Sequence, residues 1–482
     1  MALSLSTLRR RVRGHRVPGG AVGELAAAAR KGDARGTARL LRAANEDAAS
    51  DGPSDPRPVR DRLPSVAIIP RPLFTNDARS VAAEMGVERV LLLDRRHFKA
   101  MGSSILPPDI SNMAYRRVAA REPAAMLRYR SFLKQVWRHF DPAGDVRLVL
   151  TGNSCYWGEI EFGAALEELG VAFVSLHKEN LKSAGHSARW EAVYRDGRAP
   201  FLGRTVLVHN RQEHDLHISG DVVAEDRIEV VGMPRLDGFH AHRRRTAGQA
   251  VHGDLLFAGF LPAEALPRPY PYHGNPPGRS RAVGLPLPDP EERPEHLVES
   301  CFAFHRVAVE VARRLPDRRI VLKTKGRERD PKWFPLIVEH VAGPEGPPPN
   351  LVIVHGGDAA AMTRTAAMVV GLNTTMLLEA IAAGRPTVVL ALGEAAGVMR
   401  DHVLDLHGAA TVLEDESQAV QRIVELASTP QVVPAELPDQ ANEVLERLTG
   451  NTDGRATERT IAALRRSMLG TDLRSERTSS TS

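Results

Sequence analysis

The sequence is poor in cysteine and in aromatic residues, and both shortages narrow the kinds of protein it can be. Its 482 residues include two cysteines, Cys155 and Cys301. Two cysteines cannot form a zinc site alone, and they give no disulfide framework. This usage fits a reduced, cytoplasmic compartment. Aromatic residues make up 5% of the chain, so few side chains are available to stack on sugars or bases.

Long apolar runs and several common catalytic motifs are missing as well. No run approaches the roughly 20 apolar residues that a membrane-spanning helix needs, and the start lacks the pattern of a secretory signal. The sequence contains no GxxxxGKS/T, no GxGxxG after a strand, no GxSxG and no HExxH. It also has no convincing Asp-x-Asp after an apolar strand, which would suggest a metal-dependent, single-domain transferase. We therefore expect neither a metal ion nor a cofactor.

The charge of the chain limits the kinds of ligand that it is expected to bind. The formal net charge of +5 is a mild basic excess, which suits an anionic small molecule and is too weak to indicate nucleic acid binding. Five arginines lie within residues 9–16, next to several leucines. This terminus could contact an anionic membrane at its inner face, although a solvated, mobile terminus is the favoured interpretation.

Four histidines form two close pairs in the sequence, His214 with His217 and His240 with His242. Neither pair has further metal ligands nearby in the chain. We interpret all four as surface histidines.

The chain divides into four parts by composition. Residues 1–62 form a helical appendage and a Pro-rich linker. Residues 63–240 and 241–470 each alternate strand-like and helix-like segments, and residues 238–245 are a plausible hinge between them. Residues 471–482 are a polar tail that we expect to be disordered.

The alternation of segments predicts the fold class. The expected strands are 65–69, 90–94, 146–151, 171–176, 206–208, 229–231, 255–259, 319–323, 350–355, 368–371 and 387–390. The expected helices are 21–44, 78–85, 109–140, 159–169, 296–315, 376–383, 417–427 and 456–468, with a long Pro-rich loop at 262–294. Alternating strands and helices indicate an α/β protein with two Rossmann-like domains, whose parallel sheets face a cleft.

Residues 368–390 are the most informative segment. They read as strand, capped helix and strand, which is one parallel crossover. Asn373, Thr374 and Thr375 begin the helix, where free backbone amides and two hydroxyls can hold a phosphate. Glu379 lies one turn later, within reach of a sugar hydroxyl on the same ligand. An ordinary crossover helix with a threonine cap is the alternative.

Further cations follow strand ends. Lys323, Lys325 and Arg327 come directly after a strand of the second half, where their charge suits a diphosphate leaving group; a solvated basic loop is the alternative. Arg235 precedes the expected hinge, and it could bind a phosphate or pair with Asp237.

Polar residues also follow two strands of the first half. Asn153 comes after the strand at 146–151, and we assign it to acceptor binding. His177 and Glu179 follow the strand at 171–176; His177 is the preferred general base for a hydroxyl acceptor, and Glu179 is an alternative base. Glu159 is a further candidate base, although an acidic residue in the first turn of a helix is common without any catalytic role.

Two motifs resemble a known family. Residues 232–237, Gly-Met-Pro-Arg-Leu-Asp, resemble the Gly-x-Pro-Arg-x-Asp segment of CDP-glycerol glycerophosphotransferases and related capsule or surface-carbohydrate proteins. Residues 373–380 with Gly384-Arg-Pro386 are similar to the donor-site helix of those proteins. The resemblance covers about residues 65–400. It implies a GT-B fold, a nucleotide-activated donor and cell-surface polymer synthesis. Lys323-Thr-Lys325 departs from the family's Lys/His-Pro segment, so glycosyl and glycerophosphate transfer both stay open.

Together these features predict a cytoplasmic, metal-independent transferase. It would move a group from a nucleotide-activated donor to a carbohydrate or lipid-linked acceptor. A sugar-nucleotide 2-epimerase shares the architecture without needing a separate acceptor. A catalytically inactive scaffold of a surface-polymer assembly complex is the third possibility.

Overall fold

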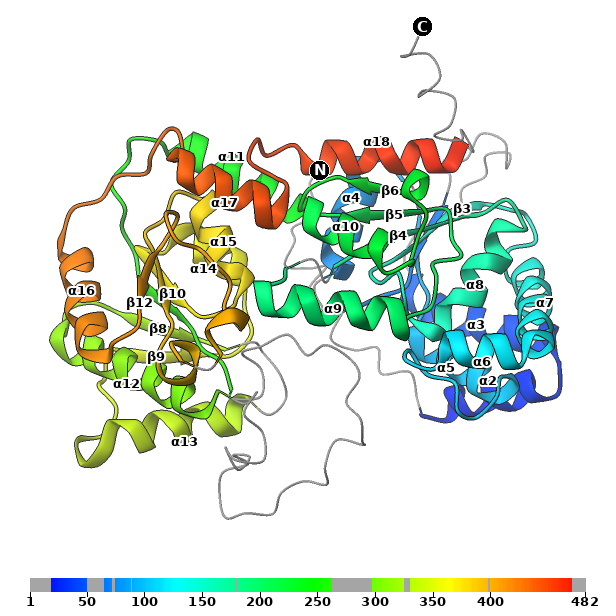
Figure 1. Cartoon of the computed structure of the whole chain (residues 1–482), viewed down its shortest axis with the longest axis horizontal. Coiled ribbons are helices and arrows are strands. Elements are labelled where there is room, and N and C mark those ends of the chain that lie inside the picture. The colour runs from blue at the N-terminus through cyan, green and yellow to red at the C-terminus, as the bar shows by residue number, and fades with distance from the viewer. Residues whose placement is uncertain are drawn as a thin grey trace, which may run out of the picture.

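The protein consists of two α/β domains that lie side by side (Figure 1). The first domain carries one parallel sheet and the second domain another. The computed structural model describes residues 19–49, 65–71, 74–87, 89–178, 181–261, 297–324, 330–397 and 399–469. This architecture confirms the predicted fold class of two Rossmann-like domains, the arrangement of the GT-B fold.

The first sheet has six strands in the order β2-β1-β3-β4-β5-β6, and every neighbouring pair is parallel. The strands are β1 (Ser65–Ile68), β2 (Val90–Leu92), β3 (Val146–Thr151), β4 (Ala172–Leu176), β5 (Thr205–Val208) and β6 (Ile228–Val230). Nearly all residues of the four central strands are buried, because helices cover both faces of the sheet. The strand order reverses between β1 and β3.

The second sheet also has six parallel strands, in the order β12-β11-β10-β7-β8-β9. The strands are β7 (Leu255–Ala258), β8 (Ile320–Lys323), β9 (Leu351–Val354), β10 (Met368–Gly371), β11 (Thr387–Leu390) and β12 (Thr411–Leu413). Here the order reverses between β7 and β10. Ligands of open parallel sheets bind at the carboxyl ends of the strands beside such a reversal, so residues after β10 are placed for binding.

Helices cover both faces of the first sheet. One core cluster joins the sheet to most of the helices, and a second cluster joins its other face to α4 and to the last helix of the chain. The helices are α2 (Gly19–Arg30), α3 (Ala34–Ala49), α4 (Phe74–Glu84), α5 (Arg95–Ile105), α6 (Tyr115–Arg121), α7 (Pro123–Phe140), α8 (Trp157–Glu167), α9 (Ala184–Asp196) and α10 (Arg211–Ser219).

The second domain has one continuous core around its sheet. Its helices are α11 (Asp237–Thr246), α12 (Val298–Arg314), α13 (Asp330–Ala342), α14 (Ala359–Thr365), α15 (Thr375–Ala382), α16 (Glu416–Ser428) and α17 (Asp439–Thr449). Among the described helices, none is long and apolar enough to cross a membrane.

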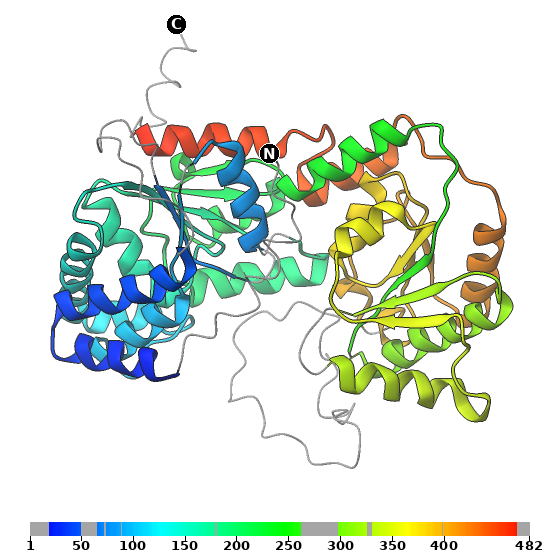
Figure 2. The same ribbon diagram turned by 180° about the vertical axis from the view of Figure 1, so that it is seen from behind.

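The last helix, α18 (Ala456–Leu469), returns to the first domain, where the two opposite views show it lying across the sheet (Figures 1 and 2). Ala463 and Leu464 pack into the apolar cluster on that face. An Arg466 Nη2 to Glu229 Oε1 contact of 2.6 Å ties the helix to β6. The sequence placed this segment in the second half of the chain, and its apolar contacts show that it completes the first.

The chain passes between the domains twice, and the two passages lie side by side. The Met233 amide donates to the Thr449 carbonyl over 2.9 Å, and the Asn451 side-chain amide donates to the Met233 carbonyl over 2.9 Å. Residues 238–245, predicted as a hinge between the domains, lie within helix α11.

Two expected helices are each divided in the structure. The helix expected at 21–44 is split into α2 and α3 at Gly32, which has a positive φ of 70°. Rather than forming an appendage, both helices bury apolar side chains such as Leu25 and Leu41 in the first domain. The region expected at 109–140 is split into α6 and α7, because Pro123 cannot continue a helix that arrives from Glu122.

Candidate functional site

A pocket of about 190 Å³ lies between the two domains. Its lining residues are Lys178, Leu181, His186, Trp190, His209, Met233, Arg235, Asn373, Thr375, His402 and Leu404. They lie in segments that follow β4, β5 and β6 in the first domain and β10 and β11 in the second, on the side of the carboxyl ends of the strands. This set holds two cations and three histidines and includes no carboxylate, which suits an anionic ligand.

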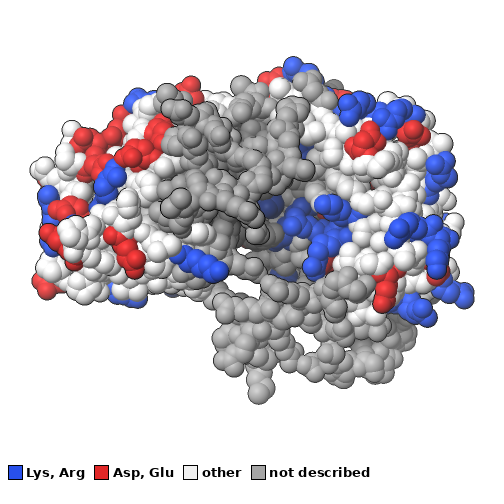
Figure 3. All heavy atoms as spheres, turned by 90° about the horizontal axis from the view of Figure 1, so that it is seen from below, with Lys and Arg blue, Asp and Glu red and all other residues white. Residues whose placement is uncertain are grey.

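The wider surface around the pocket is also basic. Seen from below, Lys and Arg side chains gather on the first domain beside the hollow between the two domains (Figure 3). A basic approach to a cleft raises the local concentration of anionic ligands and speeds their arrival.

The amino end of α15 carries the polar residues that the sequence indicated, but each of the three residues has a different role. Thr374 is the N-cap, and its hydroxyl accepts from the Met376 amide over 3.4 Å. Thr375 lines the pocket. Asn373 has a positive φ of 42°; its Nδ2 donates to the His402 carbonyl over 2.8 Å and its Oδ1 accepts from the Leu404 amide over 2.7 Å. Asn373 therefore holds a neighbouring turn in place.

The two domains also touch directly at this turn. The rings of His186 on α9 and His402 lie 4.7 Å apart, centroid to centroid, and both residues line the pocket. A side chain at Gly185 would meet the Asp401 carbonyl oxygen at 3.0 Å, so glycine permits this close approach.

Arg235 pairs with Asp77, and the expected pairing with Asp237 is wrong. Its guanidinium donates to Asp77 Oδ2, over 3.1 Å from Nε and 2.5 Å from Nη2. Asp237 instead accepts from the Thr457 amide over 2.7 Å at the start of α18. Arg235 still lines the pocket beside this ion pair.

Glu379 is a buried carboxyl on α15, with 7% of its surface exposed. Burial raises the pKa of Glu379 to about 7; Arg235 opposes this shift and Asp77 adds to it. At neutral pH this carboxyl can therefore hold or release a proton. It is not among the residues that line the pocket.

Lys323 ends β8 and is buried, and its ammonium donates to the Thr324 carbonyl. Thr324 in turn contacts His355 through its hydroxyl, 3.1 Å from Nδ1. Lys325 and Arg327, the other two cations expected to bind phosphate, lie outside the described residues, as does Glu179.

Asn153 and Glu159 are held by local contacts. The side-chain oxygen of Asn153 accepts from the Cys155 amide over 2.8 Å. Glu159 is buried, pairs with Arg71 and accepts from the Thr151 hydroxyl over 2.6 Å. Burial raises the pKa of Glu159, and Arg71 opposes the shift. Neither residue lines the interdomain pocket.

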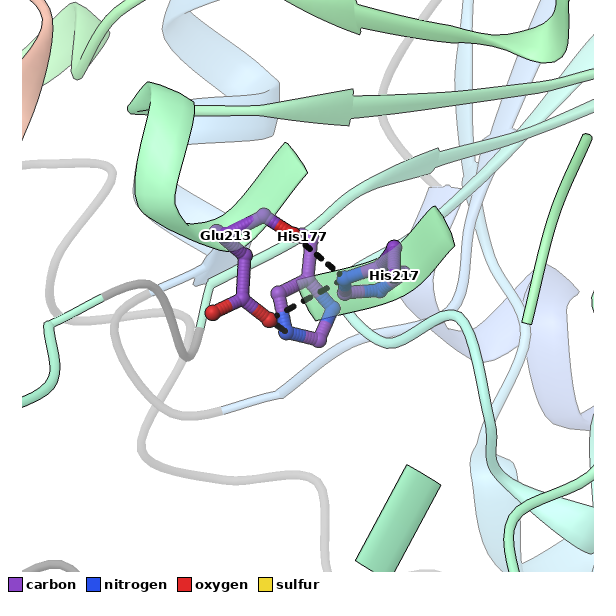
Figure 4. Close-up of side chains that lie close together, drawn as sticks. All are labelled: His177, Glu213 and His217. Carbon is purple, nitrogen blue, oxygen red and sulfur yellow. Dashed lines mark hydrogen bonds and ion pairs between the residues drawn. The ribbon is translucent and has the colours of Figure 1, made fainter. Parts of the chain in front are cut away.

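His177 belongs to a buried polar network centred on Glu213 (Figure 4). His177 Nε2 lies 3.3 Å from Glu213 Oε1, and His217 Nδ1 lies 3.2 Å from the same oxygen. The Tyr194 hydroxyl donates to this oxygen over 2.7 Å, and Lys182 donates to Glu213 Oε2. Four side chains thus converge on one carboxylate.

On the far side of the imidazoles, Ser154 Oγ lies 2.7 Å from His217 Nε2 and 3.4 Å from His177 Nδ1. These contacts fix the orientation of both rings toward Glu213. Burial alone would raise the pKa of Glu213, but Lys182 and the two histidines hold it well below its usual range. The carboxylate therefore stays charged inside the domain.

The interpretation of the paired histidines as surface residues is wrong for three of them. His217 and His240 are fully buried, and 6% of His214 is exposed. His240 contacts the Asn451 carbonyl over 3.0 Å at the second passage between the domains. His214 and His217 have acidic partners close by in the sequence, Asp215 and Glu213, whereas the partner of His240 comes from a distant segment.

Within the described chain, His177, Glu213 and His217 are the residues that could hold a metal ion. Their ligand atoms lie within 4.8 Å of one another. Lys182 already supplies a positive charge to Glu213, however, and a divalent cation would add uncompensated charge to a buried site. The contacts fit a hydrogen-bonded network with one buried Lys–Glu ion pair better than a metal centre.

Acidification should destabilise the protein between about pH 6.5 and pH 4. Burial lowers the pKa of His177 and of His305 to about 4, and that of His209 to about 3. An unfolded histidine has a pKa of about 6.5. At these three histidines the unfolded chain binds more protons in this window, so their contribution to the free energy of unfolding falls as the pH falls, whereas the raised pKa of Glu379 contributes in the opposite direction. Thermal unfolding followed across this range measures the effect.

His305 offers a variant that isolates one contribution. It lies in the core of the second domain against the rings of Phe304 and Phe334, so His305→Phe should flatten part of the pH dependence. The exposed residue His340 provides the control, and His340→Gln should leave it unchanged. The same pH dependence of the melting temperature in His305→Phe and the wild type would contradict the assignment of a neutral, buried His305.

Several pocket residues were missed from the sequence. His186 and Trp190 come from α9, for which no helix was expected, and His402 comes from a turn of the second domain. His209 follows β5 just as His177 follows β4. The rule that selected His177 at a strand end would also have selected His209.

Comparisons with known proteins show likeness at the level of structure. No family model matches the chain, and no curated protein matches it. One similar solved structure is the wall teichoic acid polymerase TagF, at 9% identity and a TM-score of 0.47, covering 97% of this chain and 99% of that one. Another is UDP-GlcNAc 2-epimerase from Neisseria meningitidis, at 9% identity and a TM-score of 0.45, covering 84% and 100%.

A third similar structure is the glycotransferase of kitacinnamycin, at 16% identity and a TM-score of 0.41, covering 84% of this chain and 100% of that one. Because all three identities are low and all three TM-scores are below 0.5, we argue the function from the pocket itself.

Proposed function

We propose that the protein is a GT-B-type transferase that takes a nucleotide-activated donor. One observation supports this most: the pocket between the domains combines Arg235, Lys178 and three histidines with the amino end of α15. A diphosphate carries the opposite charge, and helix amides together with the Thr375 hydroxyl suit its oxygens. The second domain would hold the donor, with Glu379 near its sugar hydroxyls.

The transferred group would be glycosyl or glycerophosphate-like, and the acceptor a hydroxyl of a carbohydrate or lipid-linked molecule. The acceptor oxygen would form the new bond while the bond to the leaving nucleotide phosphate breaks. His177 would take the proton of the hydroxyl, and the α15 amides and Lys323 would stabilise the charge on the leaving phosphate. Asn153 would lie on the acceptor side. The contact of the basic terminus with a membrane belongs to the same proposal and involves residues 9–16, outside the described residues.

Donor turnover with and without an acceptor tests the proposal. A thermal-shift screen with CDP, UDP, GDP, CMP and their sugars first selects the nucleotide, since a ligand at 100 times its Kd adds about 2.7 kcal/mol of stability. Turnover that requires a hydroxyl acceptor supports a transferase. Isomerisation of the sugar nucleotide without an acceptor would assign the site to epimerisation, and binding without turnover would indicate a scaffold.

The two threonines of α15 should respond differently to removal of their hydroxyls. Thr375→Val should weaken nucleotide binding by about 1.5–3 kcal/mol, the worth of a hydrogen bond to a charged group, with unchanged stability. Thr374→Val should instead cost about 1 kcal/mol of stability, because Thr374 is the N-cap. Titration calorimetry and urea unfolding separate the effects. Unchanged nucleotide affinity in Thr375→Val would show that this helix does not bind the phosphate.

A further inference from the structure

A second cavity, of about 450 Å³, lies in the second domain at the opposite end of its sheet. Its lining residues are Ile381, Gly384, Arg385, Pro386, Thr387, Gly408, Ala409, Ala410, Thr411, Leu426, Gln431, Val432, Pro434, Leu437, Pro438 and Ala441. Thr387 begins β11 and Thr411 begins β12. The cavity therefore opens at the amino ends of the strands, whereas the interdomain pocket lies at their carboxyl ends.

Arg385 is the charged residue of this lining, and it is held without a counter-charge. Only 8% of its surface is exposed, and its Nε has no hydrogen-bond partner. Its Nη2 contacts His242 Nε2 over 3.1 Å. Among the described residues, no carboxylate forms an ion pair with Arg385. A buried guanidinium in this situation has lost hydration that the contact with His242 replaces only in part.

The neighbours of Arg385 add positive charge. Arg243, 3% exposed, packs beside Gly384 and donates to the Ala435 carbonyl, while its Nε has no partner. Arg385 and other arginines lower the pKa of His242, whose main perturbation is burial. Glu436 is close enough to favour the charged form of Arg243, but it forms no ion pair with it among the described residues. The region carries an excess of cations.

The remainder of the lining is mostly apolar. Ile381, Leu426, Leu437 and Ala441 contribute alkyl groups. Val432 also lines the cavity and is exposed over 62% of its surface, which is unusual for a large apolar side chain in this protein. A ligand that satisfied the whole cavity would carry one anionic group and an apolar portion.

We propose that this cavity binds an amphiphilic organic anion, with a phosphate or carboxylate head group at Arg385 and a single apolar chain along the alkyl side chains. The anion would replace the counter-charge that Arg385 lacks, in a partly desolvated place where a charge-assisted hydrogen bond is strong. The apolar chain would cover Val432 and its neighbours. The site is distinct from the donor pocket and does not depend on the proposed transfer reaction.

The cavity and the donor pocket are joined by one short element. Helix α15 presents Thr375 to the donor pocket at its amino end and Ile381 to the second cavity near its carboxyl end. An anion held at Arg385 would therefore lie against the same helix that is proposed to bind the donor phosphate.

Titration calorimetry on the full chain tests the proposal with n-octyl phosphate, octanoate, inorganic phosphate and octanol, all below micelle-forming concentrations. We expect one site per chain for at least one of the two amphiphilic anions, and the tighter of them identifies the head group. Octanol and inorganic phosphate should each bind at least tenfold more weakly. Equal binding of octanol would overturn the role of charge, and equal binding of inorganic phosphate would overturn the amphiphilic class.

Two variants locate the site. Arg385→Gln should weaken binding of the amphiphilic anion at least tenfold, whereas Arg422→Gln should not, because Arg422 is half-exposed on α16 and pairs with Glu425. Thr411→Phe should also weaken binding by filling the cavity at a half-buried strand position that accepts an aromatic residue. Unchanged affinity in either Arg385→Gln or Thr411→Phe would refute the site. Should Arg385→Gln fail to fold, Thr411→Phe alone tests the site.

The ligand-free proteins give an independent readout. Removing an uncompensated buried cation should leave the melting temperature of Arg385→Gln unchanged or higher. A lower melting temperature than that of the wild type would contradict the absence of a counter-charge. Thr375→Val should bind the amphiphilic anion like the wild type, which separates this site from the donor pocket.

Discussion

Replacing Glu213 by glutamine should lower the free energy of unfolding by about 3–5 kcal/mol, the usual cost of removing one partner from a buried ion pair. Glutamine keeps the shape of the side chain but removes the carboxylate that pairs with the Lys182 ammonium, and only 3% of Lys182 is exposed. It also replaces an acceptor that His177 and Tyr194 face. Urea unfolding followed by circular dichroism measures the loss.

Glu168 provides a matched control for this substitution. It pairs with Lys134 at 2.5 Å, but 41% of its side chain is exposed. Exposed ion pairs contribute about 0–1 kcal/mol, so Glu168→Gln should have a small effect. Similar losses of stability in Glu213→Gln and Glu168→Gln would show that burial does not increase the contribution of the Lys182–Glu213 pair.

A second substitution separates the loss of the Lys182–Glu213 ion pair from the loss of packing around Glu213. Adding Lys182→Met to Glu213→Gln should recover part of the stability, because the double variant no longer buries an ammonium beside a neutral glutamine. If the double variant is less stable than Glu213→Gln alone, the ion pair is not the source of the loss.

Replacing His177 by glutamine should lower turnover by roughly 100-fold while nucleotide affinity is retained, as expected for removal of a general base. Glu213 holds the imidazole at Nε2, in the way that a carboxylate orients a catalytic histidine. His177 does not line the pocket in the ligand-free chain, whereas the next residue, Lys178, does. Contacts of this kind often tighten only when substrate is bound. Steady-state kinetics and titration calorimetry give the two quantities.

The pH dependence of turnover identifies the base. Burial lowers the pKa of His177 to about 4, so turnover should stay high on acidification until about pH 4, and this acidic limb should vanish in His177→Gln. His209→Gln tests the neighbouring histidine that lines the pocket. Wild-type turnover in His177→Gln together with collapse in His209→Gln or Glu159→Gln would move the role to that residue.

Much of the fold was readable from the sequence, because buried parallel strands are short apolar runs bounded by turn residues. All eleven strands expected from such runs overlap strands of the two sheets, for example at 146–151 and 368–371, and only β12 among the described strands was not expected. Helix boundaries were less readable. Gly32 and Glu122 each divide a run of good helix formers, and helix α11 carries residues that resemble a linker in composition.

The donor side of the site was more predictable than the acceptor side. Asn373, Thr374 and Thr375 are contiguous, so one capped helix brings them together, and local rules are sufficient. The Glu213 network joins residues that follow β3 and β4 to residues of α9 and α10. Apart from the i,i+4 contact of His217 with Glu213, these contacts depend on tertiary packing, and no spacing in the sequence marks Glu213 as the acceptor for Lys182. The same holds for the pairing of Arg235 with Asp77, which are 158 positions apart.

Helix α18 has a consequence for how the protein is made. It covers the face of the first sheet where Val66 and Leu148 lie, yet it is the last described segment of the chain. Translation adds about 5–20 residues per second, so the ribosome needs on the order of ten seconds or more after β6 to release α18. Throughout that time the first domain has all its strands but lacks one covering helix. Its folding can therefore be completed only after the second domain has been synthesised.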